Sequence, residues 1–299
     1  MSIFNKNHKS LIIIAGPTAS GKTHISLSLA EKFQTEIISA DSRQIYKEFN
    51  IGVAMPEDES LRKVKHHFIR SNTIHEPLNA FDYGQAALMC IKQLFKKHQL
   101  LIMAGGSGLF IKSVYHGIDE FPDTSVELRA SLTELRNDNY PKMLKKLQML
   151  DPEYYNVVDT SNPVRVQRAL EVCILTGRKF SELRQNTGRL HDFKIHKYAL
   201  LLPMKELEAR IEKRLETMKN SGLLKEARAL FKYRHLPPLR TIGYQELFDY
   251  FEGKTNEMQA WDRIRSNTRK YAKKQITWFR KEQFEMIEPA RALELFELI

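Results

Sequence analysis

The sequence is poor in the residues that build disulfide frameworks and zinc sites. Its 299 residues include two cysteines, Cys90 and Cys173, and neither lies in a CxxC pair or in a cluster of cysteine and histidine. A disulfide scaffold and a structural zinc site are therefore not expected. Two reduced thiols in a core are typical of a cytosolic protein, so we expect a cytoplasmic location.

Long apolar runs are also missing. The first ten residues contain no hydrophobic segment of the signal-peptide type, and the apolar run from Leu11 to Ala15 has only the length of a strand. We therefore expect neither a signal peptide nor a transmembrane segment.

Acidic residues are outnumbered by basic ones. There are 36 Asp and Glu against 47 Lys and Arg, which gives a formal net charge of +11. Apolar residues make up 42% of the chain, enough for a sizeable core and too many for a disordered protein. The positive excess favours a polyanionic partner, with nucleic acid as the first candidate and an anionic membrane surface as the second. A basic protein without such a partner is the alternative.

The first part of the chain alternates short apolar runs with helical patterns. Strands are predicted at Leu11–Ala15, Glu36–Ala40 and Leu100–Gly106. This alternation predicts an α/β fold, a parallel sheet with helices on both faces. Ligands of such sheets lie beyond the carboxyl ends of the strands. Asp41, Gly105 and Gly106 come at strand ends, so we expect them to converge on one site.

From about Asp119 the pattern becomes helical. The stretches "SVELRASLTELR", "YPKMLKKLQML" and "NPVRVQRALEVCILTG" are consecutive helix patterns, and the next predicted strand is Lys197–Pro203. A long helix pattern closed by Gly222 follows it. We predict a helical insertion at residues 119–195 within a discontinuous core formed by residues 1–118 and 196–299.

The stretch "GPTASGKT" matches the phosphate-binding pattern G-x4-G-K-T. Backbone N–H groups of such a loop wrap an anion, and the helix that follows points its positive end at it. Lys22 adds a charge and the Thr23 hydroxyl is placed to bind Mg²⁺. A glycine-rich turn without a ligand is the alternative. The predicted phosphate-binding residues are Gly16, Pro17, Thr18, Ala19, Ser20, Gly21, Lys22 and Thr23.

A second Mg²⁺ carboxylate of the ATPase type is missing after the apolar run at Leu100, which ends in glycines. Asp41 instead follows the other strand, and Ser42, Arg43 and Gln44 come next, with side chains suited to a base edge or a phosphate. Asp41 could act as a base or as an orienting group, cap a helix, or bind Mg²⁺. The stretch "AGGSGLF" supplies the Ser107 hydroxyl on a second loop, or forms only a tight turn.

The segment "WDRIRSNTRKYAKKQITWFRK" carries eight basic residues and one acidic residue. Its charges, including Lys273 and Lys274, suit phosphates, and its aromatic residues are expected mainly in the core. A merely solvated basic face is the alternative. Arg210 and Arg214 are four residues apart and could pair with Glu206 or Glu208, or reach the anion. His66 and His67 have no third ligand at metal-site spacing, which favours a structural role.

Seven stretches together resemble the tRNA dimethylallyltransferase family, also called tRNA isopentenyltransferases or IPP transferases. The resemblance runs from about Leu11 to Lys281. It implies a P-loop NTPase-like core with a helical insertion that contacts tRNA, Mg²⁺ as cofactor, a monomer, and no membrane partner. The stretches, in the order expected of the family, are "GPTASGKT", "SADSRQIY", "HHFI", "AGGSGLF", "NPVRVQRALE", "TIGYQE" and "TRKYAKKQITWFRK".

The reaction that the resemblance implies moves a dimethylallyl group from dimethylallyl diphosphate to N6 of adenine 37, beside the anticodon of tRNAs that read codons starting with U. Asp41 matches the residue that accepts the N6 proton, and Ser107 stands where the family usually has threonine. Arg129 matches a position at the reaction site, and Arg214 is a further candidate for the diphosphate. The tRNA-contacting matches, besides basic-helix residues Lys273 and Lys274, are Asp41, Ser42, Arg43, Gln44, Val164, Arg165, Val166, Gln167 and Arg168.

The chain departs from the family pattern at "GVAMP", residues 52–56, where "GTAKP" is common. Val53 replaces a hydroxyl and Met55 replaces a cation, so the polar contacts that the resemblance implies for those side chains are not expected here. Phe110 replaces a tyrosine and lacks its hydroxyl.

Three other functions compete. An adenylate isopentenyltransferase that uses AMP or ATP would need neither the helical insertion nor the basic helix. A small-substrate P-loop kinase would need the missing acid, although Asp41 could fill that place. A protein that only binds tRNA would not need intact Lys22, Thr23 and Asp41.

Overall fold

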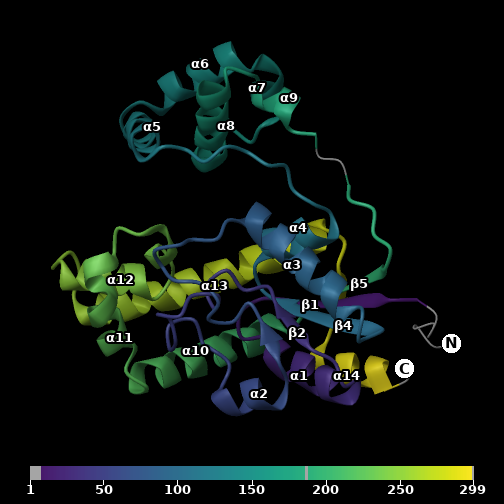
Figure 1. Cartoon of the computed structure of the whole chain (residues 1–299). Helices are drawn as coiled ribbons and strands as arrows, with labels where there is room; N and C mark the ends of the chain where they lie inside the picture. Colours follow the sequence, from purple (N-terminus) through teal and green to yellow (C-terminus); the bar gives the residue numbers. More distant parts are fainter. Residues whose placement is uncertain (1–7, 186–187, 298–299) are drawn as a thin grey trace. The chain divides into compact units, whose positions relative to one another are not determined.

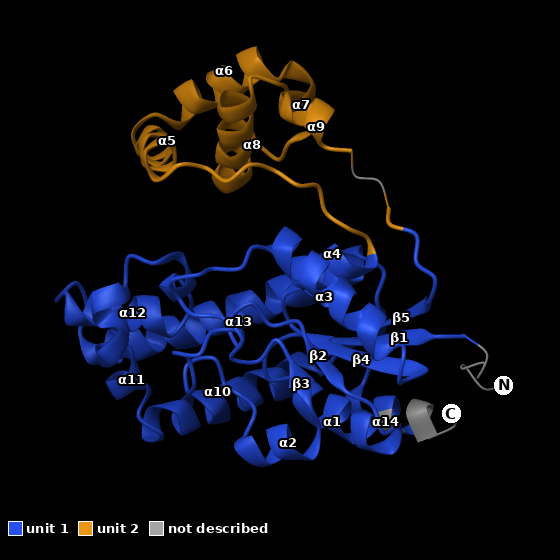
Figure 2. Ribbon diagram, viewed as in Figure 1, with its two compact units in different colours: residues 1–115, 190–299 blue, residues 116–189 orange. Residues whose placement is uncertain are grey.

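The computed structural model describes residues 8–185 and 188–297. It divides the chain into two compact units (Figure 2). The first unit combines Met1–Tyr115 with Leu190–Ile299, and the second is His116–Arg189. The polypeptide therefore leaves the first unit once and returns to it, and each unit has a core of its own.

The first unit is built on a parallel sheet, as the sequence predicts. Within the described residues, six strands pair in the order β3-β2-β4-β1-β5-β6, and every pairing is parallel (Figure 1). The P-loop strand β1 therefore lies between β4 and β5. The strands are β1 Ser10–Ala15, β2 Ile37–Ser39, β3 His66–His67, β4 Leu100–Gly105, β5 Lys194–Leu200 and β6 Glu285–Ile287.

One strand starts earlier than its apolar residues indicate. β5 begins at Lys194, whereas the apolar pattern places the start at Lys197. Lys194 and Ile195 pair in register with Ser10 and Leu11 of β1. The hydrogen-bonded pairing with β1 thus sets the start of β5. Backbone pairing does not require apolar side chains, so it extends beyond the apolar part of the strand.

Helices cover both faces of this sheet. Side chains alternate along β1, so that Leu11 and Ile13 enter one core while Ile12 and Ile14 enter another. Figure 1 shows α3 and α4 on one side and α1 and α14 on the other. The helices of this unit are α1 Lys22–Lys32, α2 Asp58–Lys63, α3 Ala80–Leu94, α4 Gly108–Tyr115, α10 Met204–Asn220, α11 Leu223–Leu230, α12 Tyr244–Phe251, α13 Glu257–Lys281 and α14 Pro289–Glu297, with 3-10 helices at Phe231–Tyr233 and Pro237–Leu239.

The second unit is a helical bundle in which α5 to α8 begin at side-chain caps. Ser125, Asn139, Asp151 and Asn162 each accept a backbone N–H three residues further on. Such caps satisfy the free N–H groups of a first turn and fix where short helices begin. The helices are α5 Val126–Asp138, α6 Tyr140–Leu150, α7 Pro152–Val157, α8 Pro163–Thr176 and α9 Phe180–Leu183.

The two units differ in charge. Residues 116–189 contain 11 Lys or Arg and 11 Asp or Glu, so the second unit is neutral and the first carries the whole excess of +11.

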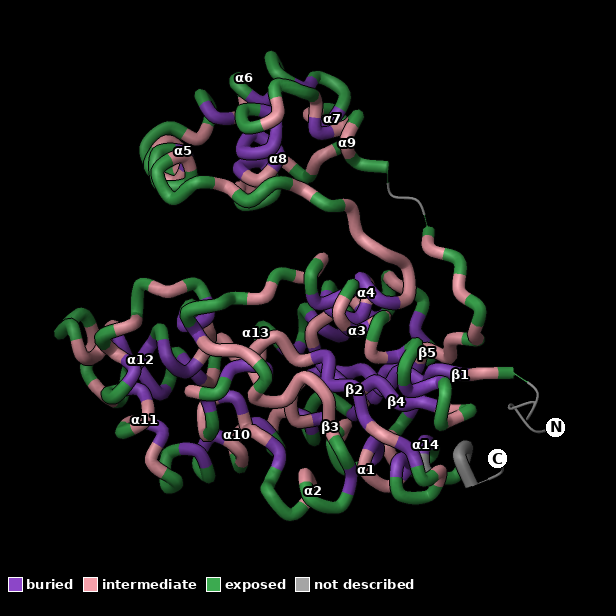
Figure 3. The backbone as a smooth tube through the Cα atoms, viewed as in Figure 1, coloured by how far each residue is buried: buried purple, intermediate pink, exposed green. Residues whose placement is uncertain are grey.

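Figure 3 shows the buried residues along the sheet and on the inner sides of the helices. Among the described residues, no helix is both long and apolar enough to cross a membrane.

Candidate active site beside the phosphate-binding loop

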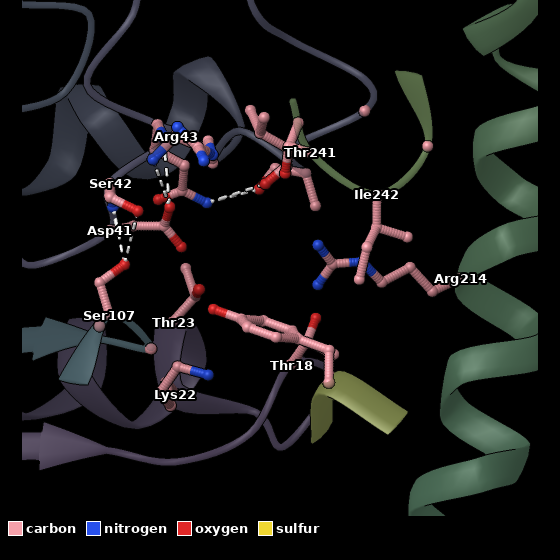
Figure 4. A pocket seen from close by; sticks show the side chains of 18 of the residues that line it. Thr18, Lys22, Thr23, Asp41, Ser42, Arg43, Ser107, Arg214, Thr241 and Ile242 are labelled. Atoms are coloured by element: carbon pink, nitrogen blue, oxygen red, sulfur yellow. Dashed lines mark hydrogen bonds between the residues drawn. The ribbon is translucent and has the colours of Figure 1, made fainter. Parts of the chain in front are cut away.

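A cavity of about 400 Å³ lies at the carboxyl edge of the sheet. Three strand-end segments meet there: the P-loop after β1, Asp41–Gln44 after β2 and Gly105–Ser107 at the end of β4 (Figure 4). The expected convergence of Asp41, Gly105 and Gly106 with the P-loop is confirmed. It follows from the sheet, because parallel strands end at the same edge. Helices α10 and α13 supply Arg214, Tyr271 and Gln275 to the lining.

The P-loop has the backbone of an anion cradle. Gly16 and Gly21 take φ angles of +145° and +92°, which L side chains rarely adopt. A Cβ on Gly16 would lie 2.9 Å from the carbonyl oxygen of Leu200. Gly21 caps α1 and provides no side-chain hydrogen bond, so the first N–H groups of the helix stay open to an anion.

Lys22 has an environment that perturbs its charge. Its ammonium donates to the Pro17 carbonyl oxygen at 2.7 Å. Burial lowers the pKa of Lys22 to about 8; the negative charge of Asp41 opposes this shift and Arg214 adds to it. Lys22 thus carries its positive charge at neutral pH and gives it up a little above.

Asp41 is fixed by the turn that it starts. Its Oδ1 accepts the backbone N–H groups of Arg43 at 2.9 Å and Gln44 at 3.3 Å. Figure 4 shows the carboxylate on the cavity side, near Thr23. Next to it, the Ser107 hydroxyl accepts the N–H of Ser42 at 2.8 Å and donates to the Ser42 hydroxyl at 3.0 Å. The carboxylate and two hydroxyls are therefore held on one wall.

The loop at residues 51–56 is held by two side chains. Gln44 donates its amide to the carbonyl oxygens of Val53 and Ala54 at 3.2 and 2.9 Å. Glu226 on α11 accepts the N–H groups of Ile51 and Gly52 at 2.8 and 3.0 Å. The amide donor of Gln44 is thus engaged within the protein. No sequence pattern indicated Glu226, which lies more than 170 residues away from this loop.

The side chains of α10 settle an alternative that the sequence left open. Arg210 pairs with Glu206 at 2.8 Å on the same helix. Arg214, one turn further, points into the cavity (Figure 4). Burial lowers the pKa of Arg214, while the charge of Asp41 opposes the shift. The cavity lining therefore combines one carboxylate, Asp41, with four cationic side chains: Lys22, Arg43, Arg214 and Arg240.

A second cavity of about 910 Å³ adjoins the first across the P-loop. Met55 lines this second cavity, whereas Val53 lines the first. Two of the three departures from the family pattern, Val53 and Met55, thus face a cavity, whereas Phe110 lines neither. Residues that line both cavities are Lys22, Thr23, Ala54, Pro56, Arg214 and Met218.

The donor set fits a magnesium ion that is held mainly by a ligand. In the part of the chain that the structure describes, no group of three or more His, Cys, Asp and Glu is placed to hold a metal. Mg²⁺ usually binds through one or two protein oxygens and substrate phosphates. The Thr23 hydroxyl and the Asp41 carboxylate are such oxygens. His67 is otherwise engaged, since it pairs with Glu36 at 2.6 Å.

The second unit holds Arg129 and the 164–168 segment. Arg129 on α5 pairs with the buried Glu171 at 3.4 Å. Val164 is exposed at the start of α8, as is Arg165. The Arg168 guanidinium donates to the Thr124 hydroxyl, the Glu171 carboxylate and the Pro122 carbonyl oxygen.

Two side chains of this segment correct the expectation of tRNA contacts. Val166 is 0% exposed and belongs to the core of the bundle. Gln167 is 6% exposed and donates to the Thr133 hydroxyl at 3.0 Å and to Glu171 at 3.2 Å. The expectation that these two side chains contact tRNA is wrong. They lie on the inner face of α8, which packs against α5 and α6.

Helix α13 divides its side chains between core, cavity and surface. Phe279 is buried, as expected of the aromatic residues, and Lys273 and Lys274 are exposed. The expectation is wrong for Tyr271, which lines the cavity and is 42% exposed. Sequence reasoning also missed Gln275, a lining residue on the same helix. An uncharged polar residue among apolar positions was the only signal for it.

The comparisons with known proteins agree on one family. The model of the IPP transferase family matches residues 44–282. The chain is 44% identical over 273 residues to the tRNA dimethylallyltransferase of Christiangramia forsetii, a match that covers 91% of this chain and 90% of that protein. The crystal structure of the full-length tRNA isopentenylpyrophosphate transferase from Bacillus halodurans has a TM-score of 0.70 and 29% identity, covering 97% and 95% of the two chains.

A third match concerns the fold alone. A structure of a eukaryotic dimethylallyltransferase acting on tRNA has a TM-score of 0.76, with 22% identity over 94% of this chain and 74% of that one. The family model and the relative both cover most of this chain, and the P-loop, Asp41 and Ser107 meet in one cavity. The chain belongs to the IPP transferase family.

Proposed function

We propose that this protein transfers a dimethylallyl group from dimethylallyl diphosphate to N6 of adenine 37 in tRNAs that read codons starting with U. The observation that carries the proposal is the single cavity in which an anion cradle faces a carboxylate anchored on backbone N–H groups. The cradle suits the diphosphate of the donor. The carboxylate suits an amine that must lose a proton. Relatives named tRNA dimethylallyltransferase support the choice of donor and acceptor.

In the proposed step, N6 of the adenine attacks C1 of the dimethylallyl group. The N6–C1 bond forms, the C1–O bond breaks, and diphosphate leaves with the electron pair. Asp41 accepts a proton from N6, which restores a neutral amine. The N–H groups of the P-loop, with Lys22 and Arg214, stabilise the charge that develops on the leaving diphosphate.

Three further residues have proposed roles around this step. Ser107 orients the Asp41–Ser42 turn, against which the acceptor adenine would bind, through its hydrogen bonds to Ser42. Thr23 would hold Mg²⁺, which supplies charge neutralisation on the diphosphate when bound. Arg129, which belongs to the second unit, is a further proposed catalytic residue.

The anticodon arm of tRNA is the proposed macromolecular partner. An unpaired loop base is the cheapest to extrude into a pocket. The surplus charge of the first unit, which includes Lys273 and Lys274, suits the phosphate backbone. The other proposed tRNA contacts are Asp41, Ser42, Arg43, Gln44, Val164, Arg165 and Arg168. We also propose that the protein acts as a monomer.

A labelled-donor assay tests the proposal. The protein is incubated with Mg²⁺, labelled dimethylallyl diphosphate and one acceptor: unmodified tRNA, AMP or ATP. We expect label only in tRNA, at adenine 37 by nuclease mapping. Label in AMP or ATP alone would assign the adenylate reaction instead. ATP hydrolysis or phosphate transfer without prenyl transfer would assign a kinase.

A further inference from the structure

Gln275 joins the P-loop to the glycine loop at the end of β4. Its Oε1 accepts the backbone N–H of Thr18 at 2.9 Å, and its Nε2 donates to the Gly106 carbonyl oxygen at 2.9 Å. Its side chain comes from α13 and is 6% exposed. Both partners belong to loops that line the cavity. One buried carboxamide therefore fixes the distance between the two loops.

Two glycines of the loop after β4, Gly106 and Gly108, allow α13 to approach the loop closely. A Cβ on Gly106 would lie 2.6 Å from Nε2 of Gln275. A Cβ on Gly108 would lie 2.7 Å from ring atoms of Trp278, one turn along α13. The absence of side chains at these positions lets the helix contact the loop backbone directly. The spacing between α13 and the loop is thus set by close packing at Gln275 and at Trp278.

The same contacts extend to the carboxylate wall. Gly106 is followed by Ser107, whose hydroxyl bonds to the N–H and hydroxyl of Ser42, next to Asp41. A continuous path therefore runs from Thr18 through Gln275 and the Gly106–Ser107 loop to the Asp41 turn. The cradle for the leaving group and the proposed base lie at the two ends of this path.

We propose that Gln275 is a positioning residue for prenyl transfer, which sets the separation between the diphosphate cradle and the Asp41–Ser107 wall. This inference rests on the proposed function. The carboxamide supplies one acceptor and one donor, as the two loops require. Leucine would leave the Thr18 N–H and the Gly106 carbonyl oxygen unpaired, and a glutamate carboxylate would place an acceptor against the carbonyl. Because misplaced reactants react slowly even when bound, the effect falls on the rate.

The test compares Gln275→Leu and Gln275→Glu with the wild type. Thr277→Ala is the matched control, because that exposed hydroxyl bonds to the Lys273 carbonyl oxygen within its own helix. Binding of inorganic diphosphate and of unmodified tRNA is measured at equilibrium, and transfer is measured in a single turnover with both substrates saturating. For Gln275→Leu we expect a rate about 10–100-fold lower, with both binding constants within about threefold of wild type.

The glutamate variant adds a pH readout that loss of packing would not produce. A protonated glutamic acid has one donor and one acceptor and so replaces the amide, whereas its carboxylate does not. The rate of Gln275→Glu relative to wild type should therefore rise as the pH is lowered from 8 to 5.5. The corresponding ratio for Gln275→Leu should stay flat. Melting curves set an assay temperature at which all variants are folded.

For Gln275→Leu, either of two results would overturn the positioning role: a rate equal to wild type, or a loss of diphosphate binding as large as the loss of rate. A pH-independent ratio for Gln275→Glu would also contradict it. A wild type that transfers nothing to tRNA would instead contradict the proposed function, and this inference with it. The two failures are therefore distinguished by the wild-type reaction.

Discussion

The Lys22 ammonium donates to the Pro17 carbonyl oxygen at 2.7 Å, so the P-loop backbone itself holds its lysine at the border of both cavities. Burial lowers the pKa of this lysine to about 8. The charged form therefore predominates below pH 8 and is lost as the pH rises through that value. Only the charged form attracts a diphosphate.

The first prediction follows for anion binding. The affinity for inorganic diphosphate should fall as the pH rises from 7 to 9, by up to about tenfold per unit above the pKa. The Lys22→Met variant should bind diphosphate weakly at every pH. Its affinity should lack the part of the pH dependence that comes from the lysine. Isothermal titration calorimetry across the pH range measures both. The ligand's own titration is common to both proteins, so parallel slopes would contradict the prediction.

Asp41→Asn should separate catalysis from binding. Asparagine keeps an oxygen for the N–H groups of Arg43 and Gln44, so the turn is retained. It cannot accept a proton, and loss of a general base typically costs about 10²–10⁴-fold in rate. We expect a single-turnover rate reduced by that factor, with diphosphate binding within severalfold. The control is Asp82→Asn, at an exposed position in the first turn of α3. An unchanged rate would remove Asp41 as the base.

Neutralising Lys273 and Lys274 should weaken tRNA binding through electrostatics. Each lost phosphate contact lowers the slope of log affinity against log salt by about 0.7–0.9. The Lys273→Gln, Lys274→Gln double variant should therefore bind tRNA less tightly at low salt and show a shallower slope. Filter binding at several salt concentrations measures this.

The control for this prediction is Lys96→Gln, Lys97→Gln. These two exposed lysines precede β4, at the amino edge of the sheet and away from the site. Their neutralisation removes the same charge but should leave the salt slope nearly unchanged. Equal slopes in the two double variants would mean that the basic face of α13 is only solvated.

Glu171 should make the second unit sensitive to acid. Burial raises the pKa of Glu171, but the hydrogen bond from Thr124 and the charge of Arg129, with bonds from Arg168 and Gln167, outweigh it, so the net shift is downward. A carboxyl with a lowered folded-state pKa contributes stability above its unfolded value near 4.5. That contribution is lost as the pH falls through the folded-state pKa.

We therefore expect Glu171→Gln to destabilise the unit by about 1–3 kcal/mol at pH 7 and to reduce the loss of stability below pH 4.5. Hydrogen exchange of peptides from residues 116–189, followed by mass spectrometry at several pH values, reports on this unit within the full chain. Glu134→Gln, at an exposed position of α5, is the control. A variant with the wild-type pH dependence would show that the buried carboxyl does not carry the acid sensitivity.

Local patterns predicted much of the fold. Apolar runs and helical spacing indicated the parallel sheet, and the P-loop pattern located Lys22 and Thr23. The convergence of Asp41 and Ser107 with the P-loop was also predictable, because strand ends in a parallel sheet share an edge. The resemblance marked the whole segment 164–168 as tRNA-contacting and did not separate the two faces of α8, so it included Val166 and Gln167 although they are buried.

The sequence by itself determined the elements that depend on near neighbours: strand and helix types, the anion cradle and the basic helix. The tertiary structure alone decided the pairings between distant segments. Gln275 reaches Thr18 and Gly106, and Glu226 reaches Ile51 and Gly52, across separations of 169 to 257 residues. Such hydrogen bonds depend on distances of about 3 Å, which are set by the packing of helices on the sheet and leave no pattern in either local sequence.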